Sequence, residues 1–196
     1  MYEAERGLFD LRRGRPLHLV TGEAEGAVSG VLLAAAEGLT HETLSLLRAV
    51  SEGPTRLSVT HHRAHSMGLT PPPPAGHVDR SAGHHTGDVS LLVDVDATPE
   101  SIWRLASGLP RKGGAPVEMS AASGPEIAGL TLSRLGQLLP AVVSVSLGEP
   151  LDDGLQSRLD SRTILTVSNE QIAALAANAR VEVTHVSDGP VPLEEA

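Results

Sequence analysis

The sequence predicts one α+β domain, in which helices pack on a mixed β-sheet. Short apolar runs of strand length recur along the chain, and segments with helical periodicity lie between them. The two kinds of segment do not alternate strictly, as they would in a doubly wound parallel sheet. Apolar residues make up 40% of the 196 residues, which is enough for a single core.

Strands are predicted where apolar and β-branched residues cluster over short runs. The predicted strands are residues 16–20, 31–36, 56–60, 89–95, 141–147, 163–167 and 181–186. Helices are predicted from their caps. Thr40 is a candidate N-cap, Thr98 precedes a proline at the first helical position, and Ser168 with Gln171 has the spacing of a capping box. Gly124-Pro125-Glu126 opens a further helix in the same way as Thr98-Pro99.

One segment interrupts this pattern. Residues 71–88 begin with four prolines and continue rich in glycine and histidine, which predicts a surface loop. Residues 189–196 predict a flexible tail. The expected organisation is therefore a single domain over residues 1–188 followed by that tail.

Composition excludes several classes of partner. The formal charge is −9, so nucleic acid and anionic membranes would be repelled. The aromatic residues are Tyr2, Phe9 and Trp103, too few for a base-stacking platform. No apolar run has the length of a membrane span, and the absence of cysteine fits a cytoplasmic protein.

Three motifs follow one another in the first half of the chain: A-A-E at residues 35–37, L-T-x-E at 39–42 and T-x-x-R-A-x-x-x-G-L at 60–69. In this order they resemble the 3,4-dihydroxy-2-butanone 4-phosphate (DHBP) synthase family of riboflavin biosynthesis. Residues 111–147 and 162–175 are similar to later segments of that family. The resemblance implies an α/β sandwich of that type, a dimer with sites at its interface, and a magnesium-dependent cleavage of ribulose 5-phosphate that releases formate.

The residues that this reaction needs are missing from the matching positions. The family's Arg-Glu-Asn-Glu-Gly-Asp loop falls on Gly26–Val31, where Ala27 and Ser29 replace the two glutamates. The family's Gly-His-Thr-Glu falls on Gly124–Ile127, where Pro125 replaces a magnesium-binding histidine and Glu126 replaces a phosphate-binding threonine. A loop without acids cannot hold a divalent cation on a sugar phosphate. We therefore expect no synthase (lyase) activity, no cofactor and no bound magnesium.

Other residues are candidates for a replacement site. His84 and His85 precede a strand where the resemblance places an active-site segment, and with Glu126 they are candidate catalytic residues. His84 and His85 could equally be a polar start to the strand. Arg111 and Lys112, before a Gly-Gly pair, could bind an anion of a substrate or form a solvated turn.

Ser29 and Thr86 are further candidates for substrate binding. His61 and His65 have the i, i+4 spacing of two metal ligands on one helix face, although an exposed polar face explains them as well.

Three functions follow from these observations. The chain could be an enzyme repurposed for a different, uncharged small molecule, for instance in secondary metabolism. It could be a pseudoenzyme that pairs with or regulates an active paralogue, or it could hold a histidine-based metal site with new chemistry. We also expect a homodimer, because leucines spread around the helix in residues 127–139 rather than along one stripe.

Overall fold

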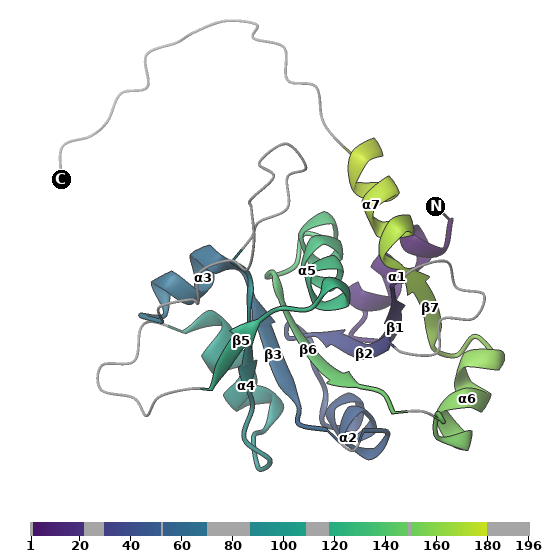
Figure 1. Ribbon diagram of the computed structural model, residues 1–196, viewed down its shortest axis with the longest axis horizontal. Coiled ribbons are helices and arrows are strands. Elements are labelled where there is room, and N and C mark those ends of the chain that lie inside the picture. Colours follow the sequence, from purple (N-terminus) through teal and green to yellow (C-terminus); the bar gives the residue numbers. More distant parts are fainter. Residues whose placement is uncertain are drawn as a thin grey trace, which may run out of the picture.

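The computed structural model describes residues 2–21, 30–51, 53–69, 87–108, 118–148 and 150–179. Its strands form one mixed sheet with the order β5-β4-β3-β6-β2-β1-β7 (Figure 1). The strands are β1 (Leu17–Val20), β2 (Gly30–Ala35), β3 (Arg56–Val59), β4 (Val89–Leu92), β5 (Met119–Ala121), β6 (Ala141–Ser146) and β7 (Leu165–Ser168). Strand β1 pairs with β7 in parallel, and every other described pair is antiparallel.

Helices lie on both faces of this sheet. They are α1 (Tyr2–Arg12), α2 (His41–Ala49), α3 (His61–Ser66), α4 (Pro99–Ser107), α5 (Gly124–Leu135), α6 (Asp153–Asp160) and α7 (Asn169–Asn178). Figure 1 shows α1, α5 and α7 together on one side of the sheet and α2 and α4 on the other. Among the described residues, no helix combines the length and the hydropathy of a transmembrane span.

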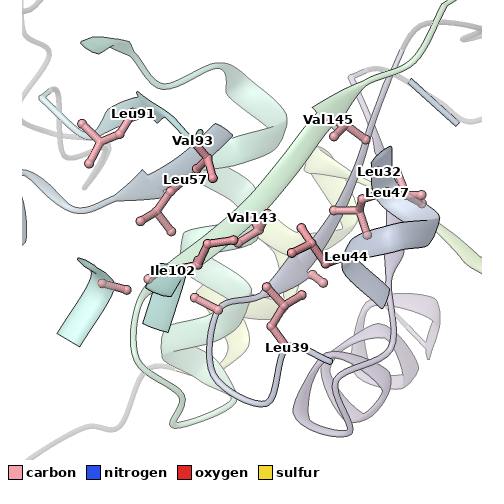
Figure 2. Packing of buried hydrophobic residues seen from close by; sticks show 14 of the residues in the cluster. Leu32, Leu39, Leu44, Leu47, Leu57, Leu91, Val93, Ile102, Val143 and Val145 are labelled. Carbon is pink, nitrogen blue, oxygen red and sulfur yellow. The ribbon is translucent and has the colours of Figure 1, made fainter. Parts of the chain in front are cut away.

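Strand periodicity divides the core into two apolar clusters. Leu57, Leu91 and Val143 lie on the face toward α2 and α4, where they pack against Leu44 and Ile102 (Figure 2). The intervening residues of the strands face the opposite way. Leu33 and Val142 belong to the second cluster, which packs against α1, α5 and α7 through residues such as Leu11, Leu130 and Ile172. The sheet is therefore the middle layer of a three-layer domain.

The predicted α+β class with a mixed sheet is confirmed, and so are the predicted caps. The Oγ1 atom of Thr40 accepts the backbone N–H of Thr43 at 3.1 Å. The hydroxyl of Ser168 accepts the N–H of Gln171 at 3.3 Å, and the Gln171 side chain accepts the Ser168 N–H at 3.0 Å. These bonds satisfy backbone donors that the first turn of each helix leaves without partners.

Some boundaries differ from the prediction. The predicted strand 89–95 ends at Leu92, and Asp94 lies beyond it with an exposed side chain. Leu130 and Leu132 are fully buried, and Leu138 packs against the same cluster, so these leucines already have partners within the chain. The expected homodimer stays a prediction. The predicted strand 181–186, loop 71–88 and tail 189–196 lie outside the described residues, apart from Gly87 and Asp88.

Candidate functional site

A row of buried hydroxyls crosses the sheet on the face that carries α5. Ser58 of β3, Ser90 of β4 and Ser144 of β6 alternate with apolar residues of the opposite cluster, so their side chains point toward α5. Each of the three is at most 1% exposed. A buried hydroxyl costs free energy unless it is hydrogen-bonded, so the partners of these serines define the site.

The carboxylate of Glu126 is the main acceptor for this row. Ser90 and Ser144 donate their hydroxyls to Oε1 at 2.9 and 2.7 Å. The backbone N–H and the hydroxyl of Ser123 both donate to Oε2, at 2.7 and 2.8 Å. Glu126 is the third residue of α5 and is only 5% exposed. One carboxylate therefore fastens the start of α5 to two strands.

Glu126 is ionised at neutral pH. Burial raises the pKa of a carboxyl group, but the hydrogen bonds from Ser123, Ser144 and Ser90 act in the opposite direction and together outweigh it. The net effect holds the pKa of Glu126 below its ordinary value. The position that the resemblance assigns to a phosphate-binding threonine thus carries a fixed negative charge.

Arg56 of β3 brings a positive charge to the same face. Its Nε donates to the Ser90 hydroxyl at 3.0 Å, and its Nη2 donates to the Ser90 carbonyl at 3.3 Å and to the Ser120 hydroxyl at 2.8 Å. Ser58 also donates to the Ser90 hydroxyl, at 3.3 Å. Arg56 forms no ion pair with any residue in the described part of the chain.

The sequence interpretation did not single out Arg56 or these serines. Their signal is the polar residues inside otherwise apolar strands: two at alternate positions in R-L-S-V at residues 56–59, and a single serine in V-S-L-L at 89–92 and in V-V-S-V at 142–145. Each strand alone reads as an ordinary half-buried strand. The strand order β4-β3-β6 makes the serines neighbours.

Helix α3 and the start of β4 lie side by side near this site. The backbone N–H of His61 donates to the Asp88 carboxylate at 3.0 Å. A Cβ built on Gly87 would lie 2.9 Å from Nδ1 of His61, so the imidazole ring packs directly on this glycine. His61 and His65 are both exposed on α3. His61 therefore lies against Gly87, the first described residue after position 86.

The remaining candidates lie outside the described residues. These are His84, His85, Thr86, Arg111, Lys112 and Ser29. Whether they converge with Glu126 stays a prediction. Within the described ranges, no three His, Asp or Glu side chains are grouped closely enough to hold a metal ion.

A histidine that the sequence interpretation did not single out lies inside the sheet. His18 of β1 is 4% exposed, and its Nδ1 contacts Oγ1 of Thr166 at 3.1 Å. Its Nε2 is buried and has no hydrogen-bond partner in the described structure. Burial lowers the pKa of His18, so its ring is neutral at neutral pH.

A shallow cavity of about 300 Å³ lies apart from the serine row. It is lined by Ala36, Glu37, Gly38, Leu39, Pro99, Glu100 and Trp103. Pro99 and Trp103 belong to α4, which packs on the opposite face of the sheet from α5. This cavity is therefore separate from the Glu126 site.

This fold is found in a known class of enzyme, the DHBP synthases. A solved synthase of Candida albicans matches with a TM-score of 0.61 and 20% identity, over 87% of this chain and 95% of that one. A two-domain synthase from A. baumannii matches with a TM-score of 0.63 and 14% identity, over 97% of this chain and 62% of that one.

A synthase solved in complex with two magnesium ions matches with a TM-score of 0.61 and 16% identity, over 89% of this chain and 96% of that one. No protein-family model matches the sequence, and a comparison with curated proteins gives no match. The similarity to solved structures establishes the fold.

Proposed function

We propose that this chain uses the DHBP synthase fold as a repurposed enzyme, acting on a small molecule other than ribulose 5-phosphate and without magnesium. The main support for this proposal is the buried, ionised carboxylate of Glu126. It stands where the resemblance puts a phosphate-binding threonine. A fixed negative charge there would repel a phosphate group, and Pro125 beside it has no side-chain donor for a metal.

The convergence of polar groups favours an enzyme over a pseudoenzyme. Glu126, Arg56 and the serine row meet on one sheet face from four separate elements of the chain. A protein without a ligand has no need of a cation on this face, and an apolar strand surface would pack against α5 at lower cost. Convergent polar groups on a rigid scaffold are what a ligand site requires.

The proposal is tested by a ligand screen followed by a test of conversion. Small molecules are added without magnesium, and thermal unfolding is recorded. A ligand at about 100 times its dissociation constant adds about 2.7 kcal/mol to the free energy of unfolding, which is readily detected. Each stabilising compound is then incubated with the protein and followed by proton NMR. We expect at least one such compound to be consumed.

Two serines on β6 provide a matched pair for this screen. Ser144 is buried and bonded to Glu126, whereas Ser146 lies two residues on with an exposed side chain. We expect Ser144→Ala to slow conversion and Ser146→Ala to leave it unchanged. If both variants converted the compound at the rate of the wild type, the reaction would take place elsewhere in the protein. Binding without any conversion would favour the pseudoenzyme that pairs with an active paralogue.

A histidine-based metal site is a second candidate function. The observation that favours it is the contact between the His61 ring and Gly87, which directly follows His84-His85-Thr86 in the chain. A tetrahedral zinc site has four ligands, and His61, His65, His84 and His85 would supply that number. Zinc titration of the wild type and of a variant lacking His61 and His65 separates this candidate from the first.

A further inference from the structure

We propose that Arg56 and Ser120 form the binding point for a carboxylate group of the ligand, so that the small molecule bound by this fold is a carboxylic acid. This inference rests on the proposed function and specifies its ligand class. It differs from the sequence-based expectation of an uncharged ligand, which stays a prediction.

Arg56 has more N–H donors than it uses within the protein. A guanidinium has five N–H groups, and those that Arg56 uses come from Nε and Nη2. Its Nη1 has no acceptor among the described residues. The Ser120 hydroxyl accepts a hydrogen bond from Arg56, so its own proton is left to donate. Arg56 therefore presents donors only, and Ser120 adds a hydroxyl proton beside them, so the free donors at this point match an oxyanion.

Arg56 and Ser120 are both accessible from solvent. Ser120 is exposed and Arg56 is partly exposed, so a ligand can reach both. Leu92, on the same face of β4 as Ser90, is partly exposed and belongs to neither apolar cluster. This part of the sheet face thus carries a fixed cation beside a small apolar surface. A carboxylate attached to a short apolar or hydroxylated body fits that combination.

The charges of Arg56 and Glu126 limit the charge of a ligand that can bind here. Glu126 lies one hydroxyl away from Arg56, because Ser90 accepts from Arg56 and donates to Glu126. The four hydrogen bonds that the Glu126 carboxylate accepts hold it in place, away from a direct contact with Arg56. Arg56 carries one positive charge and forms no direct ion pair with Glu126 in the described part of the chain, so its guanidinium can take one carboxylate as a direct partner. A phosphate dianion would need a second cation and would lie close to Glu126, which favours a monoanionic carboxylate.

The test uses the full chain labelled with ¹⁵N, and sodium acetate and inorganic phosphate as probes at constant ionic strength. We expect acetate to shift the Arg56 Nε–Hε signal and the Ser120 amide signal saturably, and phosphate to bind more weakly. Removing a charge-assisted hydrogen bond weakens binding about tenfold or more, which is the expected effect of Arg56→Gln. Arg56→Lys keeps the charge without the planar fork and should give an intermediate loss.

Arg48→Gln is the matched control. Arg48 is also partly exposed and donates to backbone carbonyls, those of Asp94 and Ala97, but it lies on α2. It should bind acetate like the wild type. Thermal unfolding of each variant establishes that it is folded, and Arg56→Lys serves if Arg56→Gln is not.

The inference is overturned if acetate gives no saturable shift, if Arg56→Gln and Arg56→Lys bind acetate as the wild type does, or if phosphate binds more tightly than acetate. A result that refutes the carboxylate binding point differs from a result that refutes the proposed enzyme. A neutral compound that the protein converts would refute the carboxylate and keep the enzyme. Acetate bound at Arg56, with no compound converted, would keep the binding point and refute the enzyme.

Discussion

Arg56 and Glu126 are joined through a single hydroxyl. Ser90 accepts the Nε–H of Arg56 at 3.0 Å and donates its own proton to Oε1 of Glu126 at 2.9 Å. The two opposite charges lie on different elements, β3 and α5, and form no direct ion pair. The hydroxyl between them holds both side chains in place, so this part of the sheet is organised by a polar network rather than by apolar packing.

Replacing Glu126 should make the protein less stable and less sensitive to acid. The folded-state pKa of Glu126 lies below 4.5, so its contribution is fully present above that value and is lost as pH falls through the folded-state pKa. We expect Glu126→Gln to lower the free energy of unfolding by about 1–3 kcal/mol at neutral pH. Urea denaturation at neutral and acidic pH measures both effects.

Glu118→Gln is the control for this substitution, because Glu118 is exposed and precedes β5 on the same part of the sheet. It should change neither the stability at neutral pH nor the acid dependence. Parallel acid dependence of the wild type and Glu126→Gln would contradict the ionised, hydrogen-bonded state of Glu126.

His18 should make the protein lose stability in mild acid. Its folded-state pKa lies below 6.5, because burial disfavours the imidazolium. As pH falls below 6.5, the unfolded chain binds a proton that the folded chain does not, so the free energy of unfolding decreases by up to about 1.4 kcal/mol per pH unit. The loss ends when pH passes the folded-state pKa.

The measurement is urea denaturation of the wild type and His18→Asn across this range. The variant should show a shallower pH dependence, and His65→Gln, which replaces an exposed histidine on α3, should match the wild type. If His18→Asn kept the full dependence, another group would be responsible.

Much of the fold could be predicted because local signals agree with the tertiary structure. Thr40 and Ser168 begin helices as their side-chain chemistry requires. Strand β5 could not be predicted, because Met119–Ala121 is only three residues long and forms by pairing with β4. The start of α5 at Gly124 was predicted, but the burial of Glu126 was not, since its serine partners Ser90 and Ser144 lie in strands far away in sequence.

Magnesium should not raise the unfolding temperature. Within the described ranges no group of carboxylates and histidines is arranged for a metal ion, and the sequence Gly26–Val31 contains no acid. We expect millimolar magnesium and micromolar zinc to leave thermal unfolding unchanged. A zinc-dependent increase of several degrees that disappears in His61→Ala combined with His65→Ala would instead support the histidine-based metal site.

Light scattering should give a mass of about twice the 20.4 kDa of one chain. Closed two-fold pairing is the commonest form of assembly for soluble proteins. Exposed Tyr2 and Phe9 on α1 offer large apolar side chains for a contact between copies. A mass near 20.4 kDa at micromolar concentration would contradict the dimer.

This chain has the fold of the DHBP synthases, and we propose that it does not carry out their reaction. The most direct measurement is formate release from ribulose 5-phosphate in the presence of magnesium, with an active synthase assayed in parallel. We predict no formate above the level of a protein-free blank, because Pro125 and Glu126 cannot bind the metal and the phosphate. Formate release that increases with protein concentration and saturates with substrate would contradict the claim.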